Sequence, residues 1–406
     1  MKIRTVTSFF DPAEYPDIHK ILGQLSVFTS EAVQRFSRDC AEVQSTRLAT
    51  TPFPTWLPVH DPEAAIAAVT ALETAASAAG FAYLGLGPAL PEVPQSYDLL
   101  LPLLKATRNV FMGGIVTGEP ASIHLAAVKA CAQVIEAAAA VTADGFTNLR
   151  FAALANVQPY TPFFPAAYAR KERPAFALAL EAADVALEAF RKASSLSEAR
   201  QRLLDELHRH TASMERVALE LADKFEIEFK GIDCSVAPFP EDWCSIGGAL
   251  ESLGLGGLGQ HGSLAAAAFL ADTLDLGSWR KVGFNGLMLP VLEDSTLARR
   301  SGNTLGVKDL LLFSAVCGTG LDTVPLPGSI SAAQIAALLL DVAALSVRLN
   351  KPLTARLMPV PGKAAGEMTG FDFAFFSNGR LMDLEAGALS GLLAQDEVIE
   401  IRPRRR

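Results

Sequence analysis

Short hydrophobic stretches alternate with segments of helical periodicity along this chain of 406 residues. Several stretches are hydrophobic at nearly every position, which is typical of parallel strands covered by helices on both faces. The pattern predicts strands at residues 2–8, 47–51, 81–85, 109–116, 149–154, 231–236, 282–289, 311–316 and 354–359. This alternation indicates a single α/β domain over residues 1–406, with a parallel sheet that is either open or closed into a barrel.

Two of the intervening helices have clear boundaries in the sequence. Asp61 is a typical N-cap, Pro62 follows at the first helical position, and Gly80 comes just after the end of the periodic segment. Ser331 and Gln334 have the spacing of a capping box in front of a second apolar helix. These signals predict helices that begin directly after Asp61 and Ser331.

The segment 165–224 differs from the rest because no convincing strand interrupts its helical periodicity. It predicts two long helices with a hinge near residues 194–197. We expect these helices to lie outside the sheet as an insertion or lid. They would also suit the assembly of two copies of the chain into a homo-oligomer.

Composition narrows the class of protein. Half of the residues are hydrophobic, 19% are charged and the net charge is −9, which argues against disorder and against nucleic acid as a partner. The basic run 402–406 is interrupted by Pro403 and has the character of a solvated terminus. Mean hydropathy is high, at +0.27. However, Asp341 interrupts the best candidate membrane span, residues 335–347, so no membrane partner is expected.

The sequence also predicts where the protein works in the cell. The N-terminus has no long apolar region of the kind found in signal peptides. The five cysteines are widely spaced and form no CxxC pair, which is typical of a chain kept reduced. Together these features predict a cytoplasmic protein.

Candidate chemistry follows the predicted strands, because ligands of α/β proteins bind where strands lead into helices. Asp233 and Ser235 lie at the end of one apolar run. The glycine-rich loop at residues 254–263 ends in His261, Gly262 and Ser263, before a helix. Its spacing allows three interpretations: a flexible turn, a site for a small anion, or the weaker match to a dinucleotide-binding loop.

A pair of acidic residues and a cysteine offer further chemistry. Glu293 and Asp294 have the character of metal ligands or of an acid–base pair; alternatively, Asp294 caps a helix that begins near Ser295, and Glu293 is exposed. Cys317 precedes a glycine-rich turn, and Asp322 follows that turn. Cys317 is interpreted either as a reactive thiolate or as a small hydrophobic residue that is buried.

Two more residues are candidates for substrate binding. Arg356 lies within a predicted strand, where an arginine usually pairs with an acidic side chain or a ligand, unless the strand is at an edge. Asn156 lies in an aromatic, proline-rich loop that either closes over a site or packs beside one. The chain contains no GxSxG, Walker or HExxH motif, so no local motif names a reaction.

These segments resemble a known protein family. The opening IRTVT, the DCSVAP at residues 233–238, the GQHGS at 259–263 and the VCGTGLD at 316–322 are similar to the bacterial and archaeal family called domain of unknown function 711, or uncharacterised protein family 0210. Its members are often labelled as pyruvate-formate-lyase-family proteins because of their fold. The resemblance therefore implies a ten-stranded α/β barrel similar to that of glycyl radical enzymes.

The resemblance does not extend to radical chemistry. The chain has neither the glycine motif that carries the radical near the C-terminus nor an adjacent pair of cysteines, so no glycyl radical is expected. The sequence also departs from the family at residues 165–190, where the family's histidine and glycine turn are missing.

The sequence thus predicts a barrel enzyme that uses acid–base or metal-assisted chemistry on a small anionic metabolite. The predicted site brings six candidate catalytic residues to one mouth of the barrel: Asp233, His261, Glu293, Asp294, Cys317 and Asp322. A divalent metal would bind Asp233, Glu293 and Asp294, and Arg356 would orient a carboxylate or phosphate. Ser235, Gly262, Ser263 and Asn156 would contact the substrate. The alternative is a non-catalytic ligand-binding or regulatory protein.

Overall fold

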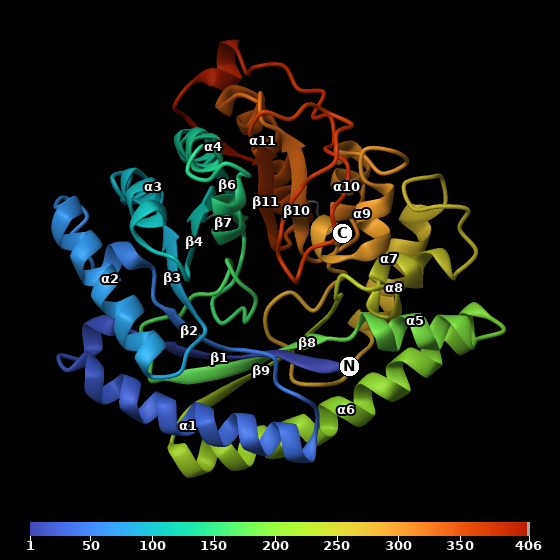
Figure 1. Ribbon diagram of the computed structural model, residues 1–406, viewed down its shortest axis with the longest axis horizontal. Helices are drawn as coiled ribbons and strands as arrows, with labels where there is room; N and C mark the ends of the chain where they lie inside the picture. The colour runs from blue at the N-terminus through green and yellow to red at the C-terminus, as the bar shows by residue number, and fades with distance from the viewer. Residues whose placement is uncertain (120, 404–406) are drawn as a thin grey trace.

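The computed structural model describes residues 1–119 and 121–403. It contains a large mixed sheet of nine described strands, in the order β10-β11-β7-β4-β3-β2-β1-β8-β9. The sheet strands are β1 (Lys2–Phe10), β2 (Thr46–Thr50), β3 (Tyr83–Ala89), β4 (Val110–Ile115), β7 (Phe151–Ala155), β8 (Ala175–Glu181), β9 (Glu228–Ala237), β10 (Gly320–Pro327) and β11 (Leu353–Val360). Figure 1 shows that these strands follow a curve, with most of the helices around its outer side.

The sheet combines three parallel groups. The five central strands β1, β2, β3, β4 and β7 run parallel to one another. On one side β8 pairs antiparallel with β1 and parallel with β9, and on the other β11 pairs antiparallel with β7 and parallel with β10. The fold is therefore mixed α/β, although the sequence predicted a parallel sheet.

In the described part of the chain, no continuous ladder joins the two edge strands. The segment 281–290 forms one parallel bridge with β9, between Ile232 and Lys281, and one with β10, between Pro290 and Asp322. The segment is therefore not a continuous strand at residues 282–289. Because the ladder between β9 and β10 is incomplete, the ten-stranded barrel stays a prediction.

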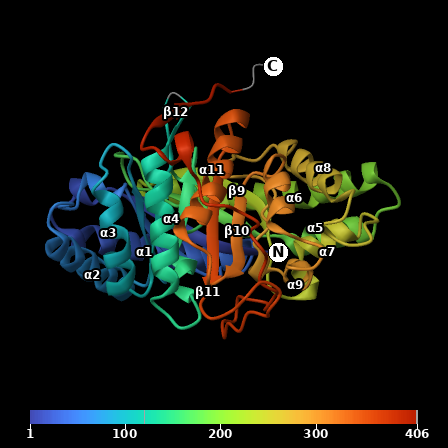
Figure 2. The ribbon, with the colours of Figure 1, turned by 90° about the horizontal axis from the view of Figure 1, so that it is seen from above.

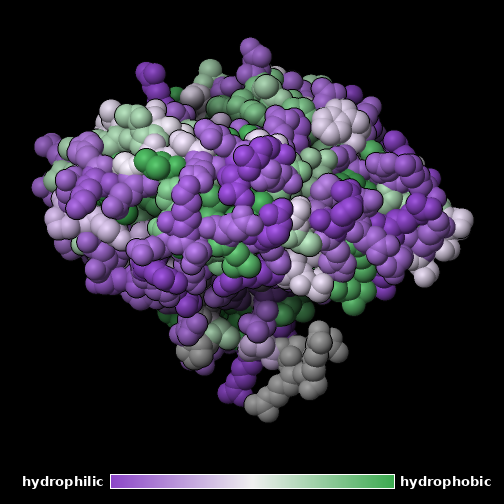
Figure 3. All heavy atoms as spheres, turned by 90° about the horizontal axis from the view of Figure 1, so that it is seen from below, coloured by the Kyte–Doolittle hydropathy of each residue, from purple (hydrophilic) through white to green (hydrophobic). Residues whose placement is uncertain are grey.

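Eleven α-helices are described. They are α1 (Ile18–Asp39), α2 (Pro62–Ala78), α3 (Ser96–Ala106), α4 (Leu125–Ala139), α5 (Ala183–Arg191), α6 (Leu196–Phe225), α7 (Ile246–Glu251), α8 (Ser263–Asp275), α9 (Ser295–Arg300), α10 (Val307–Ser314) and α11 (Ala332–Leu349). The predicted caps are confirmed, since Asp61 accepts a hydrogen bond from the Ala64 N–H and Ser331 and Gln334 form a capping box. In Figure 3 the face over α1 and α6 is mostly hydrophilic.

Two further predictions about secondary structure are wrong. The segment 165–224 contains β8, which is buried between β1 and β9; only α5 and α6 match the predicted pair of helices. Residues 311–316 were predicted as a strand, but most of them belong to α10, and the strand that follows is β10.

A second, small sheet lies at the rim of the molecule. It contains β5 (Thr117–Gly118), β6 (Ser122–His124) and β12 (Val398–Glu400), in the order β12-β6-β5. Figure 2 shows β12 apart from the large sheet. Among the described helices, only α11 is long and apolar enough to cross a membrane, but its buried face packs against α4 and β11, as in a core helix.

The two faces of the sheet differ in their packing. The outer face packs large aliphatic side chains such as Ile3, Val6 and Leu48 against the helices in one extensive core. The inner face carries small side chains such as Ala49 and Ala177, which pack with aromatic rings in a second cluster. Small residues on the concave side leave room for a cavity among the strands.

Candidate functional site

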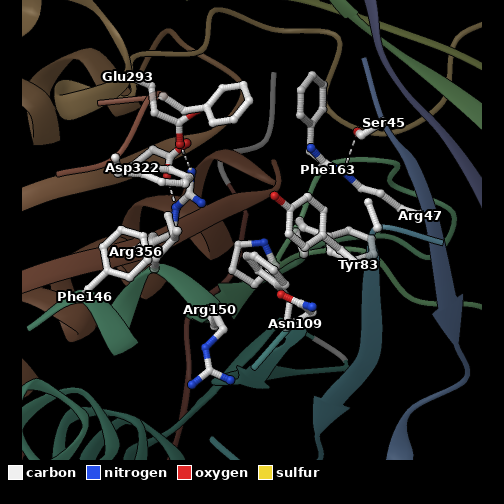
Figure 4. A pocket seen from close by; sticks show the side chains of 18 of the residues that line it. Ser45, Arg47, Tyr83, Asn109, Phe146, Arg150, Phe163, Glu293, Asp322 and Arg356 are labelled. Carbon is white, nitrogen blue, oxygen red and sulfur yellow. Dashed lines mark hydrogen bonds and ion pairs between the residues drawn. The ribbon is translucent and has the colours of Figure 1, made fainter. Parts of the chain in front are cut away.

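A pocket of about 570 Å³ lies on the inner side of the curved sheet. Its walls come from both ends of the chain, because Arg4 of β1, Arg47 of β2, Asp322 of β10 and Arg356 of β11 all line it. Figure 4 shows Arg47 and Tyr83 on one side of the pocket, with Glu293, Asp322 and Arg356 on the opposite side. Its size is within the usual range of pockets for small molecules.

The lining of the pocket is strongly cationic. It contains six basic residues and two acidic ones, although the whole chain carries a net charge of −9. The basic residues are Arg4, Arg47, Lys105, Arg108, Arg150 and Arg356, and the acidic ones are Glu293 and Asp322. A concave surface of one sign focuses the field on a ligand of the opposite sign. The pocket is therefore suited to an anion.

Glu293 connects β1 and β11 through a pair of arginines. Its carboxylate accepts a hydrogen bond from Arg4 Nη2 at 2.8 Å and another from Arg356 Nη2 at 2.7 Å. Arg4 also donates to Glu181, which in turn accepts a hydrogen bond from the amide of Gln44. The Gln44 Oε1 atom is buried without a hydrogen-bond partner among the described residues, and Gln44 lines the pocket.

Asp322 lies beside this network. Its Oδ1 atom accepts a hydrogen bond from Arg356 Nε at 2.5 Å, and its side chain is 12% exposed. Burial raises the pKa of the Asp322 carboxyl above its usual value, and the neighbouring Glu293 adds to this effect, while Arg356 opposes it. A carboxyl group with a raised pKa at a pocket wall is well placed to exchange protons with a ligand.

Arg47 has no acidic partner among the described residues. Within the described chain, its side chain makes a single hydrogen bond, from Nε to Ser45 Oγ at 3.3 Å, so its terminal nitrogens stay available. The guanidinium lies 5.7 Å from the ring centroid of Tyr83 and 5.2 Å from that of Phe164. Burial, together with the nearby Arg4, lowers the pKa of Arg47 to about 9. An anion bound here would compensate a half-buried charge.

Arg150 contributes charge, but its hydrogen bonds are already used. Its guanidinium donates to backbone carbonyls of Leu104, Thr107 and Val110, at the end of α3 and the start of β4. A cation at a helix C-terminus is stabilised by the exposed carbonyl groups there. Arg150 therefore fixes the pocket wall, whereas Arg47 has nitrogens left for a ligand.

Aromatic side chains form much of the remaining wall. The aromatic lining residues are Tyr83, Phe111, Phe146, Phe163, Phe164, Phe284, Phe373 and Phe375. Phe373 and Phe375 come from the irregular segment 361–390 that follows β11. The Arg4 guanidinium lies 5.4 Å from the ring centroid of Phe375, so this segment is held against the ionic network.

Comparison with known proteins places the chain in a family. The family model described as "Uncharacterised ACR (DUF711)" matches residues 1–377. The chain belongs to this family. A UPF0210 protein of Methanopyrus kandleri is 29% identical over 357 residues, which cover 84% of this chain and 75% of that protein. One from Pyrobaculum arsenaticum is 29% identical over 396 residues, with 90% and 87% covered, and one from Pyrobaculum aerophilum is 33% identical over 264 residues, with 62% and 57% covered.

The structure brings together only some of the residues predicted for the site. In this DUF711 family member, Glu293, Asp322 and Arg356 line the pocket. Glu293 is not exposed, as one interpretation had it, because it accepts hydrogen bonds from two arginines. Arg356 is buried in the sheet between two strands and has acidic partners, which excludes the edge-strand interpretation.

Asp233 and Ser235 form a structural clamp. The buried Asp233 carboxylate accepts hydrogen bonds from the N–H groups of Ser235, Phe284 and Asn285 and from the Ser235 hydroxyl. These bonds hold the segment 281–290 against β9. Gly283, with a φ of 77°, is required beside them, because a Cβ there would lie 2.3 Å from Asp233 Oδ2. Burial raises the pKa of Asp233 to about 6.

Asp294 caps α9, as the alternative interpretation predicted. Its buried carboxylate accepts hydrogen bonds from the backbone of Thr296 and Leu297, from the Ser245 hydroxyl and from two further backbone N–H groups. In the described part of the chain, no three His, Cys, Asp or Glu side chains form a group that fits a metal ion. The hydrogen bonds of Asp233, Glu293 and Asp294 show instead three separately satisfied carboxylates, which do not fit a shared metal site.

The other predicted site residues lie outside the pocket lining. His261 and Gly262 are exposed before α8, and the Ser263 hydroxyl accepts a hydrogen bond from the Gly259 N–H. Cys317 is buried between α10 and β10, as a small hydrophobic residue would be. Asn156 follows β7, where its N–H donates to the Thr117 hydroxyl, while the neighbouring residues 163–166 do line the pocket.

Arg4 and Arg47 were missed by the sequence analysis. Both lie inside apolar strands, in the stretches IRTVT and TRLAT. The argument applied to Arg356, that an arginine within a strand pairs with an acid or a ligand, identifies them equally well. They were missed because this argument was applied to Arg356 alone.

Proposed function

We propose that this protein binds a small anionic metabolite in the pocket and that Asp322 exchanges a proton with it. The observation that carries the proposal is the half-buried Arg47, whose terminal nitrogens have no partner among the described residues. A guanidinium in this state forms paired hydrogen bonds with a carboxylate or a phosphate. The excess of cations around the pocket supports the same class of ligand.

Asp322 is the best candidate for acid–base chemistry. Glu293 already accepts hydrogen bonds from two arginines, whereas Asp322 accepts one, from Arg356. The raised pKa of Asp322 brings its protonation closer to neutral pH, where a general acid or base is most effective. Arg356 fixes the orientation of both carboxylates and adds positive charge beside them.

We further propose that the segment 281–290 acts as the tenth strand of a barrel. Its parallel bridges to β9 and β10 support this arrangement, and so does the five-stranded parallel group at the centre of the sheet. A cytoplasmic location is supported by the five cysteines, all of which are free thiols. Assembly into a homo-oligomer stays a prediction.

A non-catalytic binding protein is the second candidate. It is favoured by the absence of His and Cys side chains from the described pocket lining, whose only carboxyl groups are those of Asp322 and Glu293. In that case the pocket would hold the same anion without converting it. The two candidates share the ligand and differ only in the role of Asp322.

The test combines ligand capture with turnover. Wild-type protein, Arg47→Met, Asp322→Asn and the exposed control Arg202→Met are incubated with a metabolite extract, and bound and remaining compounds are followed by mass spectrometry. We expect Arg47→Met to lose the captured anion, and Asp322→Asn to keep it but stop its conversion. Equal capture by wild type and Arg47→Met would contradict the anion site. Capture without turnover by the wild type would establish the binding protein.

A further inference from the structure

We propose that the anion taken by this pocket is an aromatic carboxylate with a polar group at the far end of its ring. The inference rests on the proposed function, because it names the class of ligand for the same site. The pocket is much larger than an acetate or a phosphate ion requires, and eight aromatic side chains line it. The body of the ligand must therefore fill an apolar, ring-lined space as well as neutralise a charge.

Arg47 determines where the carboxylate lies. Its guanidinium is placed near the rings of Tyr83 and Phe164, at 5.7 and 5.2 Å from their centroids. The nitrogen that bonds to Ser45 is Nε, so the two terminal nitrogens are the donors left for a ligand. A carboxylate accepts paired hydrogen bonds from such a guanidinium in the plane of the group.

The opposite wall favours a ring over an aliphatic chain. Phe373 lines the pocket and packs edge to face on Phe146, at 5.0 Å between centroids, while Phe375 lies 5.3 Å from Phe373. Rings held in this way offer edges and faces to a further ring. Contacts between aromatic rings stabilise binding by more than their buried area alone would. A flat body is therefore bound more tightly here than a saturated body of similar size.

The charged end of the pocket limits the length of the ligand. Glu293, Asp322 and Arg356 lie across the pocket from Arg47 (Figure 4). A long aliphatic acid would place its apolar end against these half-desolvated charges, which is unfavourable. A hydroxyl or amino group on the ring would instead meet Asp322, whose raised pKa suits proton exchange with such a group.

The test compares ligands that differ in one property at a time. Isothermal titration calorimetry measures the binding of para-hydroxybenzoate, benzoate, cyclohexanecarboxylate, acetate and the uncharged para-hydroxybenzyl alcohol to the full chain. We expect benzoate to bind about tenfold more tightly than cyclohexanecarboxylate because of the ring contacts, and para-hydroxybenzoate to bind more tightly than benzoate because of its hydroxyl group. The alcohol should bind at least tenfold more weakly than the acid, because it lacks the charge that Arg47 recognises.

Variants separate the two parts of the ligand. Phe373→Leu and Phe375→Leu, each with an unchanged circular dichroism spectrum, should lower the affinity for para-hydroxybenzoate several-fold and leave acetate unaffected. Arg47→Met should weaken every carboxylate, and Arg202→Met none. If cyclohexanecarboxylate binds as tightly as para-hydroxybenzoate and both depend on Arg47, the aromatic inference is overturned while the anion site stands. If no carboxylate depends on Arg47, the proposed function fails as well.

Discussion

Replacing Asp233 by alanine tests whether this carboxylate holds the fold together or takes part in catalysis. The sequence placed it in the catalytic group, whereas the structure gives all its hydrogen bonds to the clamp on the segment 281–290. Asp233→Ala leaves the backbone N–H groups of Ser235, Phe284 and Asn285 without their acceptor in a buried setting. Each unsatisfied buried group costs about 1–3 kcal/mol, so the free energy of unfolding should fall by about 4 kcal/mol or more.

The assay is thermal unfolding followed by circular dichroism. For a chain of this length, a loss of about 4 kcal/mol lowers the Tm by about 5 °C, from the average entropy of unfolding per residue. Asp17→Ala is a matched control, because Asp17 caps α1 at an exposed position and accepts a single hydrogen bond from Lys20. Loss of this N-cap hydrogen bond should lower the free energy of unfolding by about 1 kcal/mol. If Asp233→Ala keeps the wild-type Tm but loses ligand binding or turnover, the structural interpretation is refuted.

The pH dependence of stability is a second test of the role of Asp233. Burial raises the pKa of Asp233 from 3.8 to about 6 in the folded protein, so the folded state binds more protons than the unfolded state between these values. Stability therefore falls as the pH rises from about 4 to about 6, by about 3 kcal/mol at most for this group. Asp233→Asn cannot ionise, and its contribution to the pH dependence of the Tm should disappear over this window.

Three further variants test the network, a cap and a rejected site. Arg356→Gln leaves the carboxylates of Asp322 and Glu293 without a shared cation. The free energy of unfolding, measured in urea, should fall by about 3–5 kcal/mol, and a fall of less than about 1 kcal/mol would contradict the role of the buried ion pairs. Ser331→Ala removes the capping box of α11 and should lower the free energy of unfolding in urea by about 1 kcal/mol. An unchanged unfolding midpoint would show that the cap does not stabilise the protein. His261 is exposed and lies outside the pocket lining. His261→Ala should therefore change the Tm and the affinity for para-hydroxybenzoate by less than the experimental error, and a loss of binding would show that His261 belongs to the site.

The sequence predicted the strands best where the apolar run was bounded by clear turns. The predicted strands that correspond to β1, β2, β3, β4, β7, β9 and β11 are confirmed within a few residues. The strand β8 was missed because its sequence, AFALALE, is rich in alanine and leucine, which favour a helix when isolated. Its pairing with β1 and β9, buried at every position, overrides that preference.

The site was predicted only in part for a topological reason. The rule that ligands bind where strands lead into helices identified Glu293 and Asp322 among other candidates, and Arg356 was identified as an arginine within a strand. The pocket also uses the amino-terminal ends of strands in the central group, where Arg4 and Arg47 lie. Asp322 and Arg356 also lie in the amino-terminal halves of β10 and β11, so a rule that considers only the carboxyl ends of strands describes only part of the wall.

The hydrogen bonds of Glu293 to Arg4 and Arg356 have a consequence for synthesis of the protein. These three side chains come from the first strand, from the middle of the second half of the chain and from β11. A growing polypeptide therefore cannot complete this network until Arg356 has left the ribosome, and the pocket wall needs Phe373 and Phe375 as well. Ligand recognition in this fold is a property of the finished chain. A ligand present during synthesis would therefore stabilise only those molecules in which the first strand already packs with the C-terminal part of the chain.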